Sequence, residues 1–222
     1  MLGRARGEVN FIDAVEIQVS REVWLPGFIF LPPGKARSVI VPLEPRGRNA
    51  HWKEDDLYPQ LAAAGHIVAA FDIRGIGDLS PEVGRGNSFY TRSHAKEESY
   101  AWASLMLGKP MLGQRVTDIL HILQALRAYT PAQNTQITIA AHGHLTVPAI
   151  FAAASDQSVS RLYTARGLES YAVLLKNEDY VEPFANFVPD ILAVTDIPEL
   201  RDHLGTRLKQ GTAWDFDTLS NL

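Results

Sequence analysis

Apolar runs alternate with helical patterns along most of this chain. Three short and nearly continuous apolar runs lie at 38–43, 66–71 and 136–141, and such runs are typical of strands buried on both faces of a sheet. Residues 111–129 instead place apolar side chains three and four positions apart, which predicts an amphipathic helix. Strands that alternate with helices predict an α/β fold with a mostly parallel, doubly wound sheet.

The first third of the chain has a different pattern. Residues 9–19 alternate apolar and polar positions, and 24–31 form a second such run in which Pro26-Gly27 indicates a bulge or an edge strand. These two segments predict an antiparallel N-terminal hairpin at one edge of the sheet. A helix is expected to begin at Asp55-Asp56 and to end at Gly65, because acidic residues favour the first turn and glycine the end.

The second half of the chain predicts one more strand, at 159–165, and short helices and loops over 177–222. Residues 204–222 contain no apolar strand pattern, so the sheet is expected to end at its sixth strand. A sheet that ends there has an unpaired edge, and we expect another copy or a partner chain to cover it. A charged, glycine-rich loop is expected from Leu79 to about Lys96. With no repeat or linker, 1–222 is expected to form a single domain.

The composition excludes several classes of protein. A formal net charge of −4 and scattered basic residues do not indicate nucleic-acid binding. The absence of cysteine excludes disulfides, thiolate catalysis and zinc sites with cysteine ligands. No run approaches the ~20 apolar residues of a membrane span, and no apolar segment of a secretory signal follows the N-terminal arginines. We therefore expect a soluble, cytoplasmic protein without a membrane or nucleic-acid partner.

The candidate chemistry lies at a predicted corner between a strand and a helix. The β-branched run 136–141 ends at the tight turn His142-Gly143-His144, and small apolar residues then begin a helix over 148–154. Strand, sharp turn and helix form the nucleophile elbow that reads Gly-x-Ser-x-Gly in esterases and lipases. The five corresponding positions here are 141–145, and the nucleophile position holds Gly143.

Further motifs occur in a consistent order around this corner. They are Asp-Ile-Arg-Gly-Ile-Gly at 72–77, the stretch 107–118 that enters the long helix, and the segments 167–171 and 187–189. On these motifs the chain resembles the α/β-hydrolase superfamily over about residues 35–205, in the branch of acetyl xylan esterase-like and dienelactone hydrolase-like proteins. The resemblance implies a relationship to carboxylic-ester hydrolases and a small-molecule ester or acyl ligand.

The sequence departs from active members of that superfamily, whose triad runs in the order serine, acid, histidine. Gly143 provides no nucleophile, and the one histidine after the elbow is His203, in a segment that is expected to be helical. We therefore expect the triad to be lost, which favours a pseudoenzyme: a non-catalytic or weakly active binding or scaffold module. The alternative is an active carboxylesterase or deacetylase that uses an unconventional site or is completed by a further C-terminal segment.

The histidines of the turn are the first candidate site residues. His142 or His144 could act as a base on bound water, because histidine titrates near neutral pH, and the two could in principle share a metal. Residues two apart on a tight turn point apart, however, and no third ligand is evident, so we expect no metal. A dinucleotide cofactor is not expected either, because Gly75-x-Gly77 is not followed by the third glycine of that fingerprint. Both histidines are interpreted as side chains that line the cleft where a ligand would bind.

Four more candidates lie in loops that follow predicted strands. Arg46 and Asn49 belong to the loop in which hydrolases place an oxyanion-hole amide. Arg74 could contact a ligand, although a buried ion pair between Asp72 and Arg74 that fixes its loop is the favoured interpretation. Ser170 is the best of several weak candidates for a replacement nucleophile, because it follows the strand at 159–165.

Overall fold

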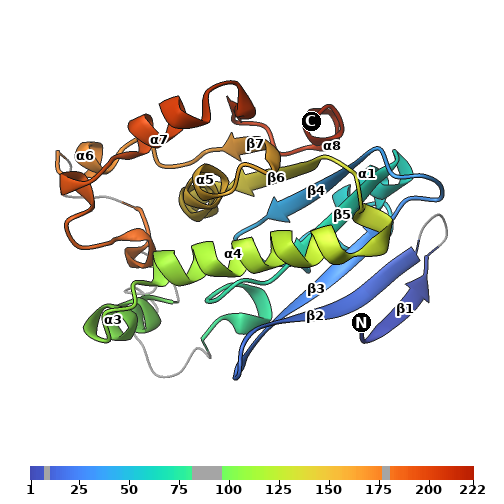
Figure 1. The fold of residues 1–222 in the computed structure, drawn as a ribbon, viewed down its shortest axis with the longest axis horizontal. Helices are drawn as coiled ribbons and strands as arrows, with labels where there is room; N and C mark the ends of the chain where they lie inside the picture. Colours follow the sequence, from blue (N-terminus) through green and yellow to red (C-terminus); the bar gives the residue numbers. More distant parts are fainter. Residues whose placement is uncertain (8–10, 82–96, 177–180) are drawn as a thin grey trace.

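The computed structural model describes residues 1–7, 11–81, 97–176 and 181–222. Across these ranges one mixed sheet of eight strands runs in the order β1-β2-β3-β5-β4-β6-β7-β8 (Figure 1). Strands β1 to β3 pair antiparallel and β3 pairs antiparallel with β5, whereas β4 to β8 are parallel to one another. The strands are β1 (Gly3–Arg6), β2 (Phe11–Ser20), β3 (Val23–Leu31), β4 (Ser38–Leu43), β5 (His66–Phe71), β6 (Ile137–His142), β7 (Val159–Ala165) and β8 (Leu208–Gly211).

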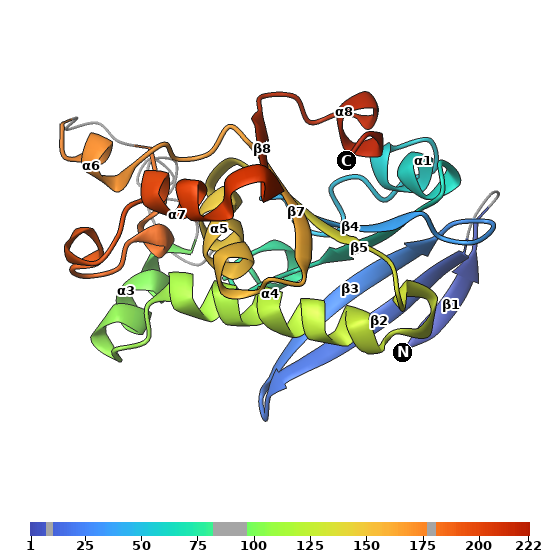
Figure 2. The same ribbon diagram turned by 45° about the horizontal axis from the view of Figure 1, so that its top comes forward.

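Helices cover both faces of this sheet. In Figures 1 and 2, α4, α5 and α7 lie over one face, and α1 and α8 lie over the other. The described helices are α1 (Leu57–Ala63), α3 (Glu98–Met106), α4 (Met111–Ala128), α5 (Thr146–Ser155), α6 (Tyr171–Leu174), α7 (Ile197–Leu204) and α8 (Phe216–Ser220). Short 3-10 turns are η1 (Gly77–Leu79), η2 (Thr130–Ala132), η3 (Gly143–Leu145), η4 (Phe184–Asn186), η5 (Ile191–Ala193) and η6 (Gly205–Arg207).

The apolar pattern of the central strands follows from burial on both faces. In β4, Val39 and Val41 belong to the core under α4 and α5, whereas Ile40 belongs to the core under α1 and α8. Successive side chains of a strand point to opposite faces, so a strand covered on both sides is apolar at every position. This confirms the predicted α/β class, the mostly parallel sheet and the antiparallel N-terminal strands.

Two strands have no apolar pattern in the sequence. Strand β1 is exposed at every position, and β8, with the sequence Leu-Lys-Gln-Gly, pairs parallel with β7 from Leu162–Leu208 to Ala165–Gly211. The prediction that the sheet ends with residues 159–165 was therefore wrong. An edge strand is held by backbone hydrogen bonds along one side and needs little apolar surface. Pairing of an edge with another copy or chain stays a prediction.

The helix predicted to begin at Asp55-Asp56 and the helix predicted over residues 111–129 are present as α1 and α4. Helix α1 begins after Asp56, whose carboxylate accepts a hydrogen bond from Leu57 N at 2.8 Å, and Gly65 follows its end. Helix α4 buries its apolar stripe, but it also buries Arg115 and Asp118. The loop expected up to Lys96 lies for the most part outside the described residues. Within the described ranges, no helix is long and apolar enough to cross a membrane.

Candidate functional site

The predicted corner is present at the carboxyl end of β6. Strand β6 ends at His142, η3 turns the chain, and α5 leaves the corner. Gly143 has φ +58°, a left-handed conformation that favours glycine. Among the described residues, and apart from its two chain neighbours, a Cβ at this position would have one atom within 4 Å, Pro45 Cγ at 3.5 Å. The corner therefore has room for a side chain at the position where Gly143 provides none.

A buried carboxylate lies beside this corner. Glu44 follows β4 directly and is 5% exposed, and its Oε1 accepts a hydrogen bond from Arg46 Nε at 2.9 Å. Its other oxygen, Oε2, lies 3.7 Å from His142 Nδ1 and 3.9 Å from His51 Nε2. His51 Nδ1 in turn lies 2.9 Å from Asp56 Oδ1. One carboxylate thus faces an arginine and two imidazoles.

His142 is held between this carboxylate and an aromatic ring from the end of the chain. Its ring stacks on Trp214, with centroids 5.2 Å apart and planes 25° apart, and its side chain is 25% exposed. Burial lowers the pKa of His142, and the nearby Glu44 carboxylate opposes that shift. The imidazole is therefore neutral at pH 7, which is the form that can accept a proton.

His144 faces a different carboxylate. Its Nε2 lies 3.8 Å from Glu97 Oε1, and the same oxygen accepts a hydrogen bond from the buried Arg115 Nη2 at 3.0 Å. Burial lowers the pKa of His144 to about 4, and the charge of Arg115 adds to this. Because His142 faces Glu44 and His144 faces Glu97, the two histidines point apart. No group of three possible metal ligands occurs among the residues whose structure is described.

The predicted pair between Asp72 and Arg74 was wrong, because each residue has another partner. Arg74 Nη2 donates to Asp118 Oδ1 at 2.7 Å, whereas Asp72 pairs with Arg48 and accepts from Arg48 N at 2.7 Å and Asp78 N at 3.0 Å. Strand β5 ends at Phe71, so the rule that residues two apart share a face no longer applies. Asp72 and Arg74 each anchor the loop after β5, but to the loop after β4 and to α4 instead of to each other.

The other candidates are distributed over the structure. Arg46 is at the site, on Glu44, while Asn49 is exposed in the same loop. Ser170 is the N-cap of α6, where its hydroxyl donates to Asp196 Oδ2 and accepts from Ala172 N at 3.0 Å. These contacts tie the Ser170 hydroxyl to a helix end.

Three side chains at the corner were not found from the sequence. Glu44 has a recognisable signal, because it directly follows a buried strand, and polar residues at such carboxyl ends meet at one edge of a parallel sheet. Glu97 and Trp214 have no such signal, since both come from parts of the chain that only the tertiary fold brings to the corner.

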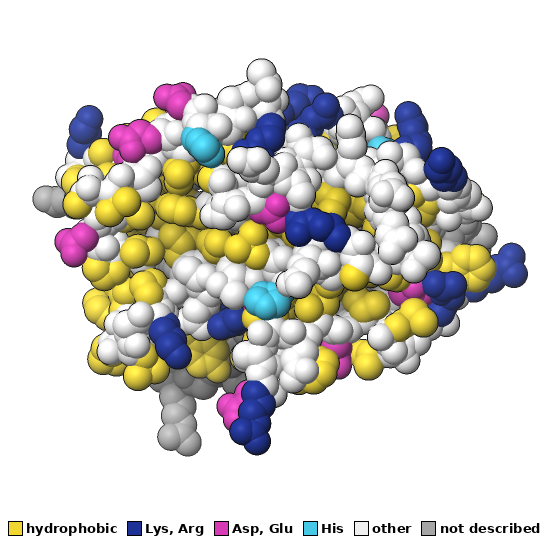
Figure 3. All heavy atoms as spheres, viewed as in Figure 1, with side chains coloured by type: hydrophobic (Ala, Val, Ile, Leu, Met, Phe, Trp, Pro, Cys, Tyr) yellow, Lys and Arg dark blue, Asp and Glu magenta, His cyan; other side chains and the backbone are white. Residues whose placement is uncertain are grey.

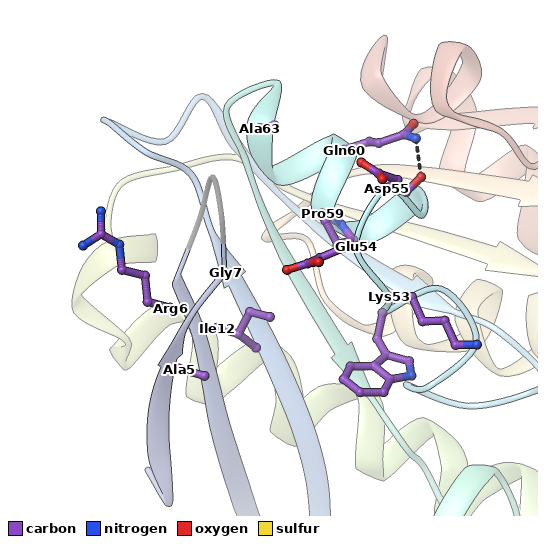
Figure 4. A pocket seen from close by; sticks show the side chains of 11 residues that line it. Ala5, Arg6, Gly7, Ile12, Lys53, Glu54, Asp55, Pro59, Gln60 and Ala63 are labelled. Atoms are coloured by element: carbon purple, nitrogen blue, oxygen red, sulfur yellow. Dashed lines mark hydrogen bonds between the residues drawn. The ribbon is translucent and has the colours of Figure 1, made fainter.

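Two cavities lie away from Glu44 and His142. One, of about 510 Å³, is lined by Arg74, Trp24, Tyr100 and Leu107, among others. The other, of about 450 Å³, lies between β1, the start of β2 and α1, and Figure 4 shows Ile12 and Pro59 together with charged side chains around it. Of the sequence candidates, Arg74 lines the first of these cavities, and neither His142 nor His144 is among the described residues that line either of the two.

One end of the molecule carries much exposed apolar surface. Figure 3 shows apolar side chains gathered over the end where α3 and α6 lie. Met106, Leu107, Leu175 and Val194 are each 77–81% exposed. Large exposed apolar patches on soluble proteins often mark interaction surfaces.

Sequence comparison alone does not assign this chain to a protein family. No protein-family model matches it, and no curated protein sequence matches it.

Solved structures are similar to it in fold. A candidate acetyl xylan esterase from Bacteroides fragilis NCTC 9343 superposes with a TM-score of 0.75 at 13% identity, over 94% of this chain and 61% of the other. An esterase from an Arctic intertidal metagenomic library gives 0.52 at 14% identity, over 74% and 64%. A dienelactone hydrolase from Anabaena variabilis gives 0.50 at 16% identity, over 72% and 65%.

This chain spans less than two thirds of the length of each of these three structures. Identities of 13–16% carry information about the fold and leave the activity open. The strand order, the corner after β6 and these superpositions agree with one another: the chain has the α/β-hydrolase fold.

Proposed function

We propose that this protein has lost the serine-dependent hydrolysis of esters and uses the sheet edge around Gly143 to bind a small ester or acyl ligand. The observation that carries the proposal is Gly143 itself. The corner has the strand, the positive φ and the helix of a nucleophile elbow, yet Gly143 places no side chain at the nucleophile position. A non-glycine residue in such a backbone costs about 1–3 kcal/mol, so glycine relieves strain once no nucleophile is required.

The position of the remaining histidine supports the same proposal. In the triad of these enzymes the histidine follows the nucleophile in the chain, and His203 is the one histidine after His144. His203 is exposed on α7. Within the described residues, the place of the serine therefore holds Gly143, and the exposed His203 does not stand in for the usual base.

The test combines a serine-reactive probe with a binding measurement. We expect a fluorophosphonate probe to leave the purified protein unlabelled. We also expect butyrate to shift the histidine ring signals of His142 in the NMR spectrum, with the exposed His203 as internal control. Stoichiometric labelling of a serine, with turnover of p-nitrophenyl butyrate that the probe abolishes, would contradict the loss of serine chemistry. Unchanged His142 signals at saturating butyrate would contradict the binding role.

A second candidate function is favoured by the apolar end near α3. Because Met106 and Leu107 are 81% and 77% exposed, we propose that this end can bind a second copy of the chain. Sedimentation velocity over a range of concentrations tests this: self-association is expected, and Met106→Glu with Leu107→Glu should abolish it. A monomer at every concentration rules this candidate out.

A further inference from the structure

We propose that Glu44 and His142 form a carboxylate–imidazole pair that activates water for attack on an activated ester at the Gly143 corner. This goes beyond the proposed function, because it adds a weak hydrolytic activity that needs no serine. His142 is the catalytic residue in this proposal, and Glu44 is a positioning residue that acts through it.

The topology of the sheet places the two residues together. Strands β4 and β6 are parallel neighbours, and Leu43 lies opposite Ala141 in their register. The next residues along the two strands, Glu44 and His142, therefore lie side by side at the carboxyl edge. The 3.7 Å between Oε2 and Nδ1 exceeds a hydrogen bond of about 2.9 Å by less than 1 Å, and catalytic hydrogen bonds in unliganded enzymes often tighten when substrate binds.

The burial of one atom of each residue favours a direct interaction between Glu44 and His142. Glu44 Oε2 and His142 Nδ1 are buried, and neither has a hydrogen-bond partner within the described ranges, although buried polar atoms are normally paired. Arg46 holds the second carboxylate oxygen, and Trp214 stacks on the imidazole. A proton on Nδ1 that faces Glu44 leaves the lone pair on Nε2, which is the arrangement of an oriented base.

Burial, together with nearby cationic groups, keeps His142 in its neutral, basic form. Burial lowers its pKa, the charges of Arg166, Arg46 and His51 add to this, and Glu44 opposes it. A neutral imidazole near pH 7 can accept a proton, and the adjacent carboxylate stabilises the imidazolium that forms.

His144 differs from His142 in its carboxylate partner and in how far its pKa falls, and both differences count against it as the base. Its Nε2 faces Glu97, whose nearer oxygen already accepts a hydrogen bond from Arg115. The pKa of His144 lies at about 4, so this imidazole is a poor proton acceptor at neutral pH.

The reaction needs only water as co-reactant. His142 Nε2 accepts a proton from water while the water oxygen bonds to the ester carbonyl carbon, and the carbonyl π electrons move to the carbonyl oxygen. The tetrahedral intermediate then re-forms the carbonyl and breaks its bond to the leaving alkoxide or phenolate, which takes the proton from the imidazolium. The products are a carboxylic acid and an alcohol. Among the described residues outside its own chain neighbours, Pro45 is the one that a Cβ at position 143 would contact, so the space directly over Gly143 is open for the ester in this proposal.

The first test compares p-nitrophenyl acetate hydrolysis by the wild type, His142→Ala, Glu44→Gln and the control His203→Ala between pH 5 and 9. We expect His142→Ala to lower the enzymatic rate, after subtraction of the buffer rate, by about 100-fold. This factor is the low end of the range for general-base catalysis. Glu44→Gln should lower kcat and move the pH profile of kcat/KM to lower pH, because the carboxylate no longer stabilises the imidazolium. His203→Ala should retain the wild-type rate.

Chemical rescue separates catalysis from folding. Imidazole added to His142→Ala, or to His142→Gln if the alanine variant does not fold, should restore hydrolysis above the rate of imidazole alone. A wild-type rate equal to buffer, an unaffected His142→Ala, or an unchanged pH profile in Glu44→Gln would overturn this inference. A buffer-level rate leaves the proposed loss of serine chemistry intact, whereas labelling of a serine by the fluorophosphonate overturns that proposal alone.

Discussion

The carboxylate of Asp118 accepts hydrogen bonds from both the guanidinium and the backbone amide of Arg74. Arg74 Nη2 donates to Oδ1 at 2.7 Å, and Arg74 N donates to Oδ2 at 3.0 Å. Asp118 is fully buried on α4, so the pair ties that helix to the loop after β5. We expect Asp118→Ala to lower the free energy of unfolding by about 3 kcal/mol, because it leaves a partly buried charge unpaired. Urea denaturation measures this loss.

Asp202→Ala is the matched control for that substitution. Asp202 is exposed on α7, and replacements at such positions usually change stability by no more than about 0.5 kcal/mol. Equal losses in the two variants would show that the contact with Arg74 does not stabilise the fold.

Gly143 and Gly77 provide a controlled comparison, because both have φ +58°. Replacement by alanine imposes the same left-handed strain at each position, about 1–2 kcal/mol. At Gly143 the nearest described atom outside the adjacent residues would be Pro45 Cγ at 3.5 Å from the new Cβ, whereas at Gly77 the new Cβ overlaps the carboxylate of Asp72. We therefore expect Gly77→Ala to have the lower melting temperature in calorimetry. A greater loss in Gly143→Ala would mean that the corner is more crowded than its contacts indicate.

The central strands could be predicted because their burial is visible in the sequence. Residues 38–43 and 66–71 are apolar at nearly every position, and both form strands covered by helices on two faces. Strand β8 could not be predicted, because Leu208–Gly211 is fixed by backbone pairing with β7 and is mostly exposed. Edge strands of this kind have little hydrophobic pattern to detect.

The site could be predicted only where it is local. His142, Gly143 and His144 are adjacent in the sequence, so their turn and their divergence follow from spacing. The contact of His142 with Glu44 depends on the pairing of β4 with β6, which are not consecutive in the chain. The misassigned partner of Arg74 has the same origin, because Asp118 reaches it from α4.

Ser170 links two helix ends, which gives its hydroxyl a measurable structural contribution. It accepts a hydrogen bond from Ala172 N at the start of α6 and donates to Asp196, the N-cap of α7. We expect Ser170→Ala to cost about 1 kcal/mol of stability, as loss of an N-cap does, and Ser170→Asn to retain part of it. If the alanine variant is as stable as the wild type in urea, the cap does not contribute.

His144 and Glu182 have opposite linkages to pH and are joined through one side chain. Asn186 Nδ2 donates to His144 O at 2.7 Å and to the Glu182 carboxylate. Burial lowers the pKa of His144 from 6.5 to about 4 and raises the pKa of Glu182 from 4.5 to about 7. His144 thus contributes stability above pH 6.5 that is lost towards pH 4, whereas Glu182 contributes stability below pH 4.5 that is lost towards pH 7.

These two contributions nearly cancel in the wild type, so single variants should reveal them. Each displaced pKa corresponds to roughly 3 kcal/mol across its pH range. Between pH 7 and pH 4.5 we expect Glu182→Gln to lose stability relative to the wild type as the pH falls, because only the His144 contribution remains. His144→Gln should gain relative stability over the same interval. Urea unfolding at several pH values measures the slope of the unfolding free energy against pH. Parallel slopes in all three proteins would show that folding does not change the pKa of either group.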